Sequence, residues 1–278
     1  MPELPEVETI RRILAPQLTG RVIRHADIRN AQVIAYPEAS VFAAFLEGQR
    51  IAGLTRRGKF LTLHLESGDR LTLHLRMTGQ LLVMPAETPT EKHTRLIFTC
   101  SDGRQLRLID VRRFGRFWFL RAQEADTVTG QAELGPEPAD PALTAEYLAE
   151  KLGARRSPIK EMLHDQTIAA GIGSICSDEI LFAARLHPQA KSAALSTADW
   201  ERLAAKIREV MAWAVDVSAM TAEEYLRMQG KAYRSMPYLR VYGRAGQPCP
   251  VCGTPLEKVT VGSRSSSCCP VCQRMKPC

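Results

Sequence analysis

The first residues of the chain could supply a nucleophile. A small second residue usually permits removal of the initiator methionine, which would leave Pro2 with a free secondary amine. An α-amino group has a pKa of about 8, so much of it is unprotonated near neutral pH. Its attack on an aldehyde gives an iminium ion, an electron sink for elimination at the adjacent carbon. Glu3 and Glu6 lie close by in sequence and could move protons. The alternative is an ordinary N-terminus that proline merely stiffens.

Six of the eight cysteines lie near the C-terminus, and four of them have the spacing of a zinc site. Two Cys-x2-Cys pairs, separated by 16 residues, comprise Cys249, Cys252, Cys269 and Cys272. A disulfide or redox pair is the alternative, but a cytosolic chain argues against disulfides and the paired spacing against an isolated redox motif. Because protein fills all four positions, the spacing predicts one structural Zn²⁺. Cys268 does not fit the Cys-x2-Cys spacing, and Cys278 is expected to be a spare thiol.

Composition and charge limit the class of protein. The 278 residues are 45% hydrophobic and 24% charged, which is typical of a globular chain and excludes a disordered one or a rod. The net charge of +7 favours a polyanionic partner, either nucleic acid or an anionic membrane surface. No apolar stretch is long enough to span a membrane, and the first residues do not form a secretory signal. We therefore expect a cytoplasmic protein.

The elements that must position these groups change in type along the chain. Residues 60–65 and 70–75 alternate as strands do, and the segment 66–69 between them forms a hairpin turn. A helix is predicted over 5–14, and the first 130 residues or so otherwise favour an antiparallel sandwich or barrel. The proline-rich segment 135–141 is expected to be a linker.

After this segment the pattern becomes helical. Helices are predicted over 144–152, 157–164 and 178–186, and Ser196 is expected to begin a longer one. The tail from about Tyr238 is expected to be a hairpin held by zinc. Strands followed by helices make this an α+β chain.

Several motifs occur in order along the chain, and together they are far more specific than any one of them. They lie at residues 1–9, 57–60, 74–79, 110–115, 157–160, 171–175 and 241–244, and the cysteine pairs follow. The chain thereby resembles, over essentially its whole length, the formamidopyrimidine-DNA glycosylase family, which is related to the endonuclease VIII group. The resemblance implies an N-terminal β-sandwich over 1–133, a linker over 134–142, a helical helix-two-turn-helix domain over 143–237 and a zinc finger over 238–278.

The resemblance also implies a reaction. Pro2 would attack C1′ of a damaged nucleotide that is flipped out of the duplex, and Glu3 would protonate the sugar or relay protons. Lys59 would assist β-elimination, and Arg264 would contact the lesion phosphate and act in δ-elimination. The other implied DNA contacts are Met77, Arg112 and Phe114, which fill the gap left by the flipped base, and His93, Arg155, Lys160 and Ser174.

The expected protein is thus a bifunctional DNA glycosylase and abasic-site lyase of base-excision repair. Its expected substrates are formamidopyrimidine and 8-oxoguanine type bases. The resemblance implies a monomer that binds double-stranded DNA with a damaged base or an abasic site. A membrane partner is not expected, and in a bacterium the protein would associate with the nucleoid.

The chain also departs from the family pattern. Ser174 stands where the family usually has asparagine, residues 217–222 replace a glycine-rich stretch, and the finger is altered over 263–268. These changes motivate one alternative, a non-catalytic paralogue that binds damaged or abasic DNA. Another is a zinc ribbon on an unrelated N-terminal domain, which leaves the ordered motifs as coincidence. Taken singly, Lys59 could be a solvated charge, and Met77 and Phe114 could be core residues.

Overall fold

A computed structural model describes residues 1–233 and 235–275, and their contacts divide the chain into two units. Unit 1 comprises Met1–Ala132 and Ala219–Tyr233, and unit 2 comprises Glu133–Ser218 and Arg234–Cys278. The segment 219–233, expected in the helical domain, therefore groups with the sandwich. The buried Tyr225 shows why, because its hydroxyl donates a hydrogen bond of 2.9 Å to the backbone carbonyl of Leu81.

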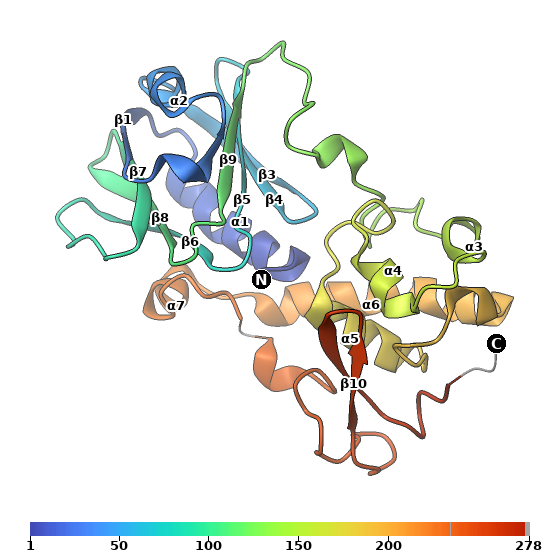
Figure 1. The fold of residues 1–278 in the computed structure, drawn as a ribbon. Coiled ribbons are helices and arrows are strands. Elements are labelled where there is room, and N and C mark those ends of the chain that lie inside the picture. Colours follow the sequence, from blue (N-terminus) through green and yellow to red (C-terminus); the bar gives the residue numbers. More distant parts are fainter. Residues whose placement is uncertain (234, 276–278) are drawn as a thin grey trace. The chain divides into compact units, whose positions relative to one another are not determined.

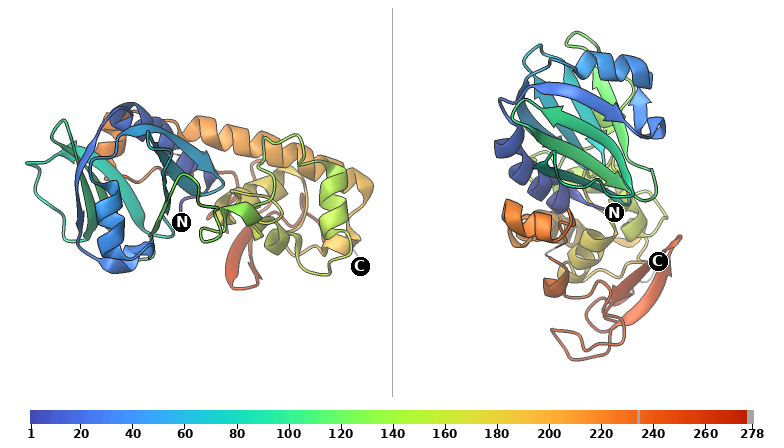
Figure 2. Two further views of the ribbon diagram at one scale, coloured as in Figure 1. Left: turned by 90° about the horizontal axis from the view of Figure 1, so that it is seen from above. Right: turned by 90° about the vertical axis from the view of Figure 1, so that its left-hand side faces the viewer.

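Unit 1 is a two-layered β-sandwich with helices packed on it (Figures 1 and 2). One sheet has the strand order β1-β7-β8-β6 and the other has the order β2-β9-β5-β4-β3. The sequence indicated an antiparallel region, and every pairing in these sheets is antiparallel except that of β2 with β9, which is parallel. Its strands are β1 (Ile23–Ile28), β2 (Ile34–Tyr36), β3 (Ile51–Arg57), β4 (Phe60–Leu65), β5 (Arg70–His74), β6 (Gly79–Pro85), β7 (Thr94–Cys100), β8 (Arg104–Asp110) and β9 (Arg116–Leu120).

Both sheets contribute to one hydrophobic core. Phe98 on β7 and Phe117 on β9 meet across the layers, with ring centroids 6.3 Å apart in an edge-to-face arrangement. Alternation along each strand sends every second side chain inward. The predicted hairpin of residues 60–75 is confirmed, with Leu63 opposite Leu71 across β4 and β5.

The helix α1 (Leu4–Leu18) begins at the second residue after the candidate nucleophile. Glu3 is its N-cap, and a capping box with Glu6 satisfies backbone N–H groups that the first turn leaves unpaired. The helix runs past the predicted end, because Leu14 and Leu18 continue the buried face. Unit 1 also contains α2 (Ala39–Leu46), α7 (Ala222–Arg227) and the short 3₁₀ helix η1 (Ala31–Val33).

Unit 2 is helical and ends in a β-hairpin. The predicted cap at Thr144 is confirmed, since its side chain accepts a hydrogen bond from the N–H of Tyr147. The helix predicted over 178–186 begins earlier, at Ser174. The elements of unit 2 are η2 (Gln131–Glu133, which begins in unit 1), α3 (Ala145–Leu152), α4 (Ile159–His164), α5 (Ser174–Ala183), η3 (Ser192–Ala194), α6 (Thr197–Ser218), η4 (Met236–Tyr238), β10 (Glu257–Val261) and β11 (Arg264–Cys268).

The expected linker is packed against unit 2. The N–H of Gly135 donates to the carbonyl of Gln166 at 2.9 Å, and that of Ala170 donates to the carbonyl of Pro136 at 3.0 Å. A Cβ atom on Gly135 would come within 2.4 Å of the backbone carbonyl of Thr167, so only glycine fits there. No helix in the part of the chain that the structure describes is long and apolar enough to cross a membrane.

Candidate active site and nucleic-acid interface

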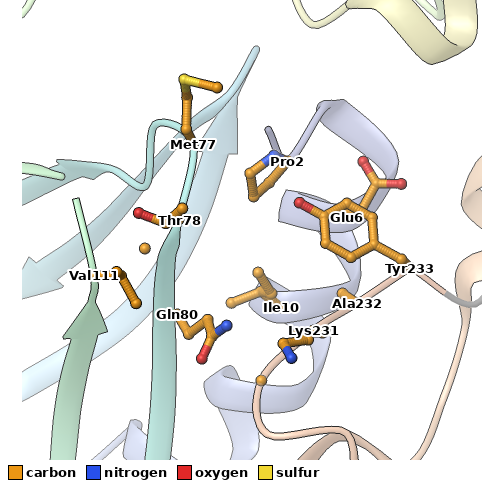
Figure 3. Close-up of a pocket in the computed structure, with 12 residues that line it drawn as sticks. Pro2, Glu6, Ile10, Met77, Thr78, Gln80, Val111, Lys231, Ala232 and Tyr233 are labelled. Atoms are coloured by element: carbon orange, nitrogen blue, oxygen red, sulfur yellow. The ribbon is translucent and has the colours of Figure 1, made fainter. Parts of the chain in front are cut away.

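A cavity of about 280 Å³ opens in unit 1 beside the first turn of α1 (Figure 3). The buried Pro2 reaches it from one side, and the segment from α7 to Tyr233 closes another. Its lining combines apolar side chains with a few polar ones, as ligand pockets do. The lining residues are Pro2, Glu6, Ile10, Met77, Thr78, Gly79, Gln80, Val111, Gly230, Lys231, Ala232 and Tyr233.

Two buried carboxylates follow Pro2 closely in the chain, Glu3 and Glu6. The N–H of Glu3 donates to Oε2 of Glu6 at 2.8 Å, and the Glu3 side chain accepts from the first turn of α1 in return. Burial, followed by repulsion from Glu3, raises the pKa of Glu6 to about 8. A proton on Glu6 near neutral pH makes this carboxyl a hydrogen-bond donor at the cavity wall.

This raised pKa predicts that stability depends on pH. Between pH 4.5 and about 8 the folded chain keeps the Glu6 proton that the unfolded chain has lost, so the proton's stabilising contribution falls as pH rises. Glu6→Gln cannot titrate, and its amide oxygen can still accept the Glu3 hydrogen bond. We therefore expect the free energy of unfolding of wild type, relative to this variant, to fall by at most about 5 kcal/mol across this window.

Glu8, on the same helix, provides the matched control. Burial opposes its ionisation, but hydrogen bonds from Arg11 and Arg12 lower its pKa to about 2. The contribution of Glu8 to stability is lost only as pH falls from 4.5 towards 2. The difference in free energy of unfolding between Glu8→Gln and wild type should therefore stay constant from pH 5 to 9. Urea denaturation at each pH measures both variants. A constant difference between wild type and Glu6→Gln would contradict the prediction.

Lys59 lies in the turn between β3 and β4 and is only 6% exposed, so it is no solvated surface charge. Both strands pack against α1, and Arg56 on β3 pairs with Glu8 on the helix, with Nε and Oε2 3.2 Å apart. His74, paired with Phe60 across the hairpin, is buried nearby. Burial, then Arg76 and Lys59, lowers the pKa of His74 to about 3, so the imidazole is neutral.

Met77, Arg112 and Phe114 form one cluster at the surface of unit 1, which we call the wedge cluster. Met77 is 46% exposed and Phe114 is 42% exposed, which excludes the alternative that they are core residues. The Arg112 guanidinium lies 4.4 Å from the centre of the Phe114 ring, and its Nη1 lies 3.0 Å from Sδ of Met77. Such a cluster offers apolar and aromatic surface together with several hydrogen-bond donors.

His93 precedes β7 and is half-buried. Its Nδ1 lies 3.2 Å from Nη2 of Arg95, and its backbone carbonyl accepts from the N–H of Asp110 at 2.9 Å. Its loop is therefore tied to the strand that leads to the wedge cluster.

Three of the predicted DNA contacts, Arg264, Ser174 and Arg155, lie in unit 2. Arg264 is exposed at the tip of the β10–β11 hairpin, which turns at Gly262 with φ +58°. Ser174 is the first residue of α5, and the N-terminus of a helix favours anions. Arg155 is exposed before α4, and its Nη1 lies 4.0 Å from Oδ2 of Asp165.

Lys160 is different, because its side chain is only 1% exposed and does not fit a direct contact with a phosphate. Its Nζ lies 2.6 Å from Oδ1 of the buried Asp178 and donates to the carbonyl of Ser265 at 3.2 Å. Asp178 also accepts hydrogen bonds from Ser266 Oγ and from the N–H of Ser267. The pair thus joins α4 and α5 to β11, the strand that begins with Arg264.

Breaking this pair should cost stability without removing a phosphate contact. Lys160→Met leaves the Asp178 charge buried without its ionic partner, and we expect a loss of about 3–5 kcal/mol of unfolding free energy. The double variant with Asp178→Asn should be less destabilised than Lys160→Met alone.

The salt dependence of binding to abasic duplex distinguishes a residue that contacts a phosphate from one that only positions other groups. Lys160→Met should leave the slope of log affinity against log salt unchanged, whereas Arg155→Met should reduce it by about 1. Anisotropy of a labelled duplex measures the slope. A reduced slope for Lys160→Met would show that Lys160 contacts phosphate after all.

The four predicted zinc ligands come together in unit 2. The Sγ atoms of Cys249, Cys252, Cys269 and Cys272 all lie within 4.8 Å of one another. Two of the separations are 3.9 Å (Cys249 to Cys272) and 3.5 Å (Cys252 to Cys269), close to the value of about 3.8 Å that a tetrahedral Zn–S₄ site requires. The cluster therefore fits one structural Zn²⁺. Cys268 lies outside it, with Sγ 3.6 Å from Nε2 of His187, and Cys278 is outside the described residues.

Reasoning from sequence missed some residues of this site. Tyr233 and Lys231 line the cavity, and their segment Gly-Lys-Ala-Tyr at 230–233 was not among the motifs on which the prediction rested. Asp178 gave no signal of its own role, because a buried carboxylate that joins helices to a strand has no characteristic spacing.

Comparison with known proteins agrees with this architecture. Three family models match consecutive parts of the chain: the formamidopyrimidine-DNA glycosylase N-terminal domain over residues 1–117, the formamidopyrimidine-DNA glycosylase H2TH domain over 134–225, and the zinc finger found in FPG and IleRS over 246–274. Formamidopyrimidine-DNA glycosylase of Symbiobacterium thermophilum is 44% identical over 98% of this chain and 89% of its own length. The formamidopyrimidine-DNA glycosylase of Geobacillus kaustophilus is 44% identical over 99% of this chain and 100% of its own length.

Solved structures give the same result. Wild-type Lactococcus lactis Fpg (MutM), in complex with DNA that contains an oxidised pyrimidine, has a TM-score of 0.89 and 32% identity over 98% of this chain and 100% of that one. The complex of the same protein with DNA that contains an abasic site has a TM-score of 0.88 and 31% identity over 98% of this chain and 99% of that one. The fold, the zinc site and these matches define a DNA glycosylase. Within this class, the chain belongs to the formamidopyrimidine-DNA glycosylase family, as its motifs predicted.

Proposed function

We propose that this protein is a bifunctional DNA glycosylase and abasic-site lyase of base-excision repair, and that the Pro2 amine is its nucleophile. One observation carries the proposal: Pro2 is buried at the wall of a cavity that Glu6 also lines, and the buried Glu3 follows Pro2 directly in the chain. A proline that merely stiffened an N-terminus would have no need of such surroundings. The amine becomes available once Met1 is removed.

The proposed reaction follows from these groups. The Pro2 nitrogen forms a bond to C1′ of the flipped nucleotide, and the damaged base leaves with the bonding electrons and takes up a proton. Glu3 protonates the ring oxygen as the sugar opens, which gives the iminium ion. Loss of a C2′ proton then expels the 3′-phosphate by β-elimination, and Lys59 assists this step. Arg264 is proposed to act in the δ-elimination that removes the 5′-phosphate.

DNA recognition is proposed to use groups of both units. Flipping a base costs a few kcal/mol of stacking and pairing. The wedge cluster supplies apolar surface that can refill the stack and hydrogen-bond donors that can pair with the base left opposite the flipped nucleotide. Arg264, Arg155 and the N-terminus of α5 at Ser174 supply charge for phosphates, which fix position without reading sequence. His93 is proposed to contact DNA beside the wedge cluster. For Lys160 we propose the positioning role described above.

Relatives indicate the substrate class. The Lactococcus lactis protein has been crystallised with Fapy-dG, with an oxidised pyrimidine and with an abasic site in its DNA. We propose formamidopyrimidine and 8-oxoguanine type bases as the substrates here.

Borohydride trapping tests the proposal. Protein whose Met1 removal has been checked by mass is mixed with duplex DNA that holds one abasic site, and borohydride is added. We expect a covalent adduct, and without borohydride we expect strand cleavage whose end groups distinguish β- from β,δ-elimination. Tight binding without an adduct would instead establish the non-catalytic paralogue. Duplexes with each lesion then rank the bases that are excised.

A further inference from the structure

The wedge cluster is carried by two separate loops of unit 1. Met77 lies in the loop between β5 and β6, and Arg112 and Phe114 lie in the loop between β8 and β9. Exposed loops of this kind are ordinarily mobile. Something must therefore hold the two loops in one arrangement if their side chains are to act together.

Asp110, the last residue of β8, joins the two loops. It is fully buried, with 0% exposure. Its Oδ1 accepts hydrogen bonds from the Thr78 hydroxyl of the first loop and from the N–H of Arg112 in the second, the latter at 3.2 Å. Its Oδ2 accepts from the N–H of Gly115 at 2.8 Å, at the other end of the second loop.

The backbone of both loops needs such support. Arg76 has φ +54° and Arg113 has φ +60°, a left-handed conformation that residues other than glycine rarely adopt. Residues keep such conformations only where the surrounding structure enforces them, and these cluster at functional sites. Each of the two lies within two residues of a group that donates to Asp110.

From this geometry we infer that Asp110 is a positioning residue for base extrusion, which holds the Met77 loop and the Arg112–Phe114 loop together as one preformed wedge. The inference rests on the proposed function, because it assigns the cluster a role in refilling the stack. Asp110 itself is buried and does not line the cavity, so it acts only through the residues that it positions. A preformed wedge has no loops to order when it enters the duplex.

Asp110→Asn tests this role. The amide has one acceptor oxygen, and its NH₂ group would face at least one of the three donors that the carboxylate now satisfies. We expect the single-turnover rate of base excision from duplex DNA to fall about 10- to 100-fold, because a displacement of about 1 Å in a positioning group can cost about 100-fold in rate. Borohydride trapping on a single-stranded abasic oligonucleotide should stay within about twofold of wild type, because there is no stack to refill. An equal loss on both substrates, or no loss on the duplex, would overturn the inference.

Two further variants keep the test decisive if Asp110→Asn folds poorly. Thr78→Val removes the hydroxyl that donates to Asp110 and that also accepts from the N–H of Arg112 at 3.2 Å, and it should show the same selective loss on duplex. Thr62→Val is the matched control, since it removes a buried threonine hydroxyl that bonds to Thr72 at 3.0 Å within the sheet. It should leave excision from duplex DNA and trapping on the single-stranded oligonucleotide unchanged. If both threonine variants behave alike, the inference fails.

A binding readout separates this inference from the proposed chemistry. The fluorescence of 2-aminopurine placed beside an abasic site in duplex DNA reports unstacking when protein binds. Wild type should give a rapid rise in fluorescence, and Asp110→Asn a rise at least tenfold slower. Absence of any covalent adduct with wild type would defeat the proposed lyase alone, whereas equal rates of rise would defeat the role of Asp110 alone.

Discussion

Replacing Pro2 with glycine is expected to lower the rate of strand cleavage at an abasic site by about 100-fold or more. Glycine still allows Met1 to be removed, but it leaves a primary amine on a flexible residue. The imine that this amine forms must gain a proton before it can draw electrons, whereas the iminium ion of proline carries its charge from the start. Glycine also lacks the ring that is buried at the cavity wall. Gel assays of cleavage, with borohydride trapping in parallel, measure the effect.

Pro16→Gly is the matched control for this substitution. Pro16 is exposed near the other end of α1, away from the cavity. The same change of residue type there should leave cleavage within a few-fold of wild type. Full activity of Pro2→Gly would refute the role of Pro2 as nucleophile.

Replacing Cys269 with alanine is expected to abolish zinc binding and, with it, tight binding to abasic duplex. Cys249 and Cys269 are buried in a small core with Leu256 and with Phe182 of α5, so the metal site joins the finger to the helices. Structural zinc sites contribute about 10–16 kcal/mol of apparent binding energy, and this energy holds the finger folded. Without it the hairpin loses the support that places Arg264. We expect zinc content below about 0.1 per chain and affinity reduced about 100-fold, because several phosphate contacts are lost together.

Cys268→Ala provides the control, since Cys268 is the immediate neighbour of Cys269 but lies outside the cluster of four sulfurs. It should keep one zinc per chain, as metal analysis of the purified protein will show. If Cys268→Ala lost the metal and Cys269→Ala kept it, the ligand assignment would be wrong. Treatment of wild type with a chelator should reproduce the Cys269→Ala result, and added zinc should reverse it.

Patterns that depend on neighbours in the chain were predictable. The cysteine spacing gave the zinc site, and the cap at Thr144 followed from one residue and the helix after it. The hairpin of residues 60–75 followed from alternation and a turn. In each case the interaction joins residues close in sequence, or a spacing that only one chemistry uses, so the residue types alone carry the information.

Pairings between distant segments were not predictable in the same way. Lys160 matched a DNA-binding position by its motif, yet Asp178 and the strand β11 enclose it. Residues 219–233 follow a helix of unit 2 in sequence, yet Tyr225 binds Leu81 in unit 1. Burial depends on what the rest of the chain brings to a residue, and one sequence does not reveal that.

The sequence by itself determined the family, the zinc ligands and the candidate nucleophile, because each depends on the identity of a few residues at fixed spacing. The tertiary structure decided the environment of those residues. It buried Glu6 and so raised the pKa of its carboxyl, and it brought the Thr78 hydroxyl of one loop to Asp110 beside the other. Desolvation and convergent hydrogen bonds arise only when the chain has folded, since both are made by segments that are far apart along it.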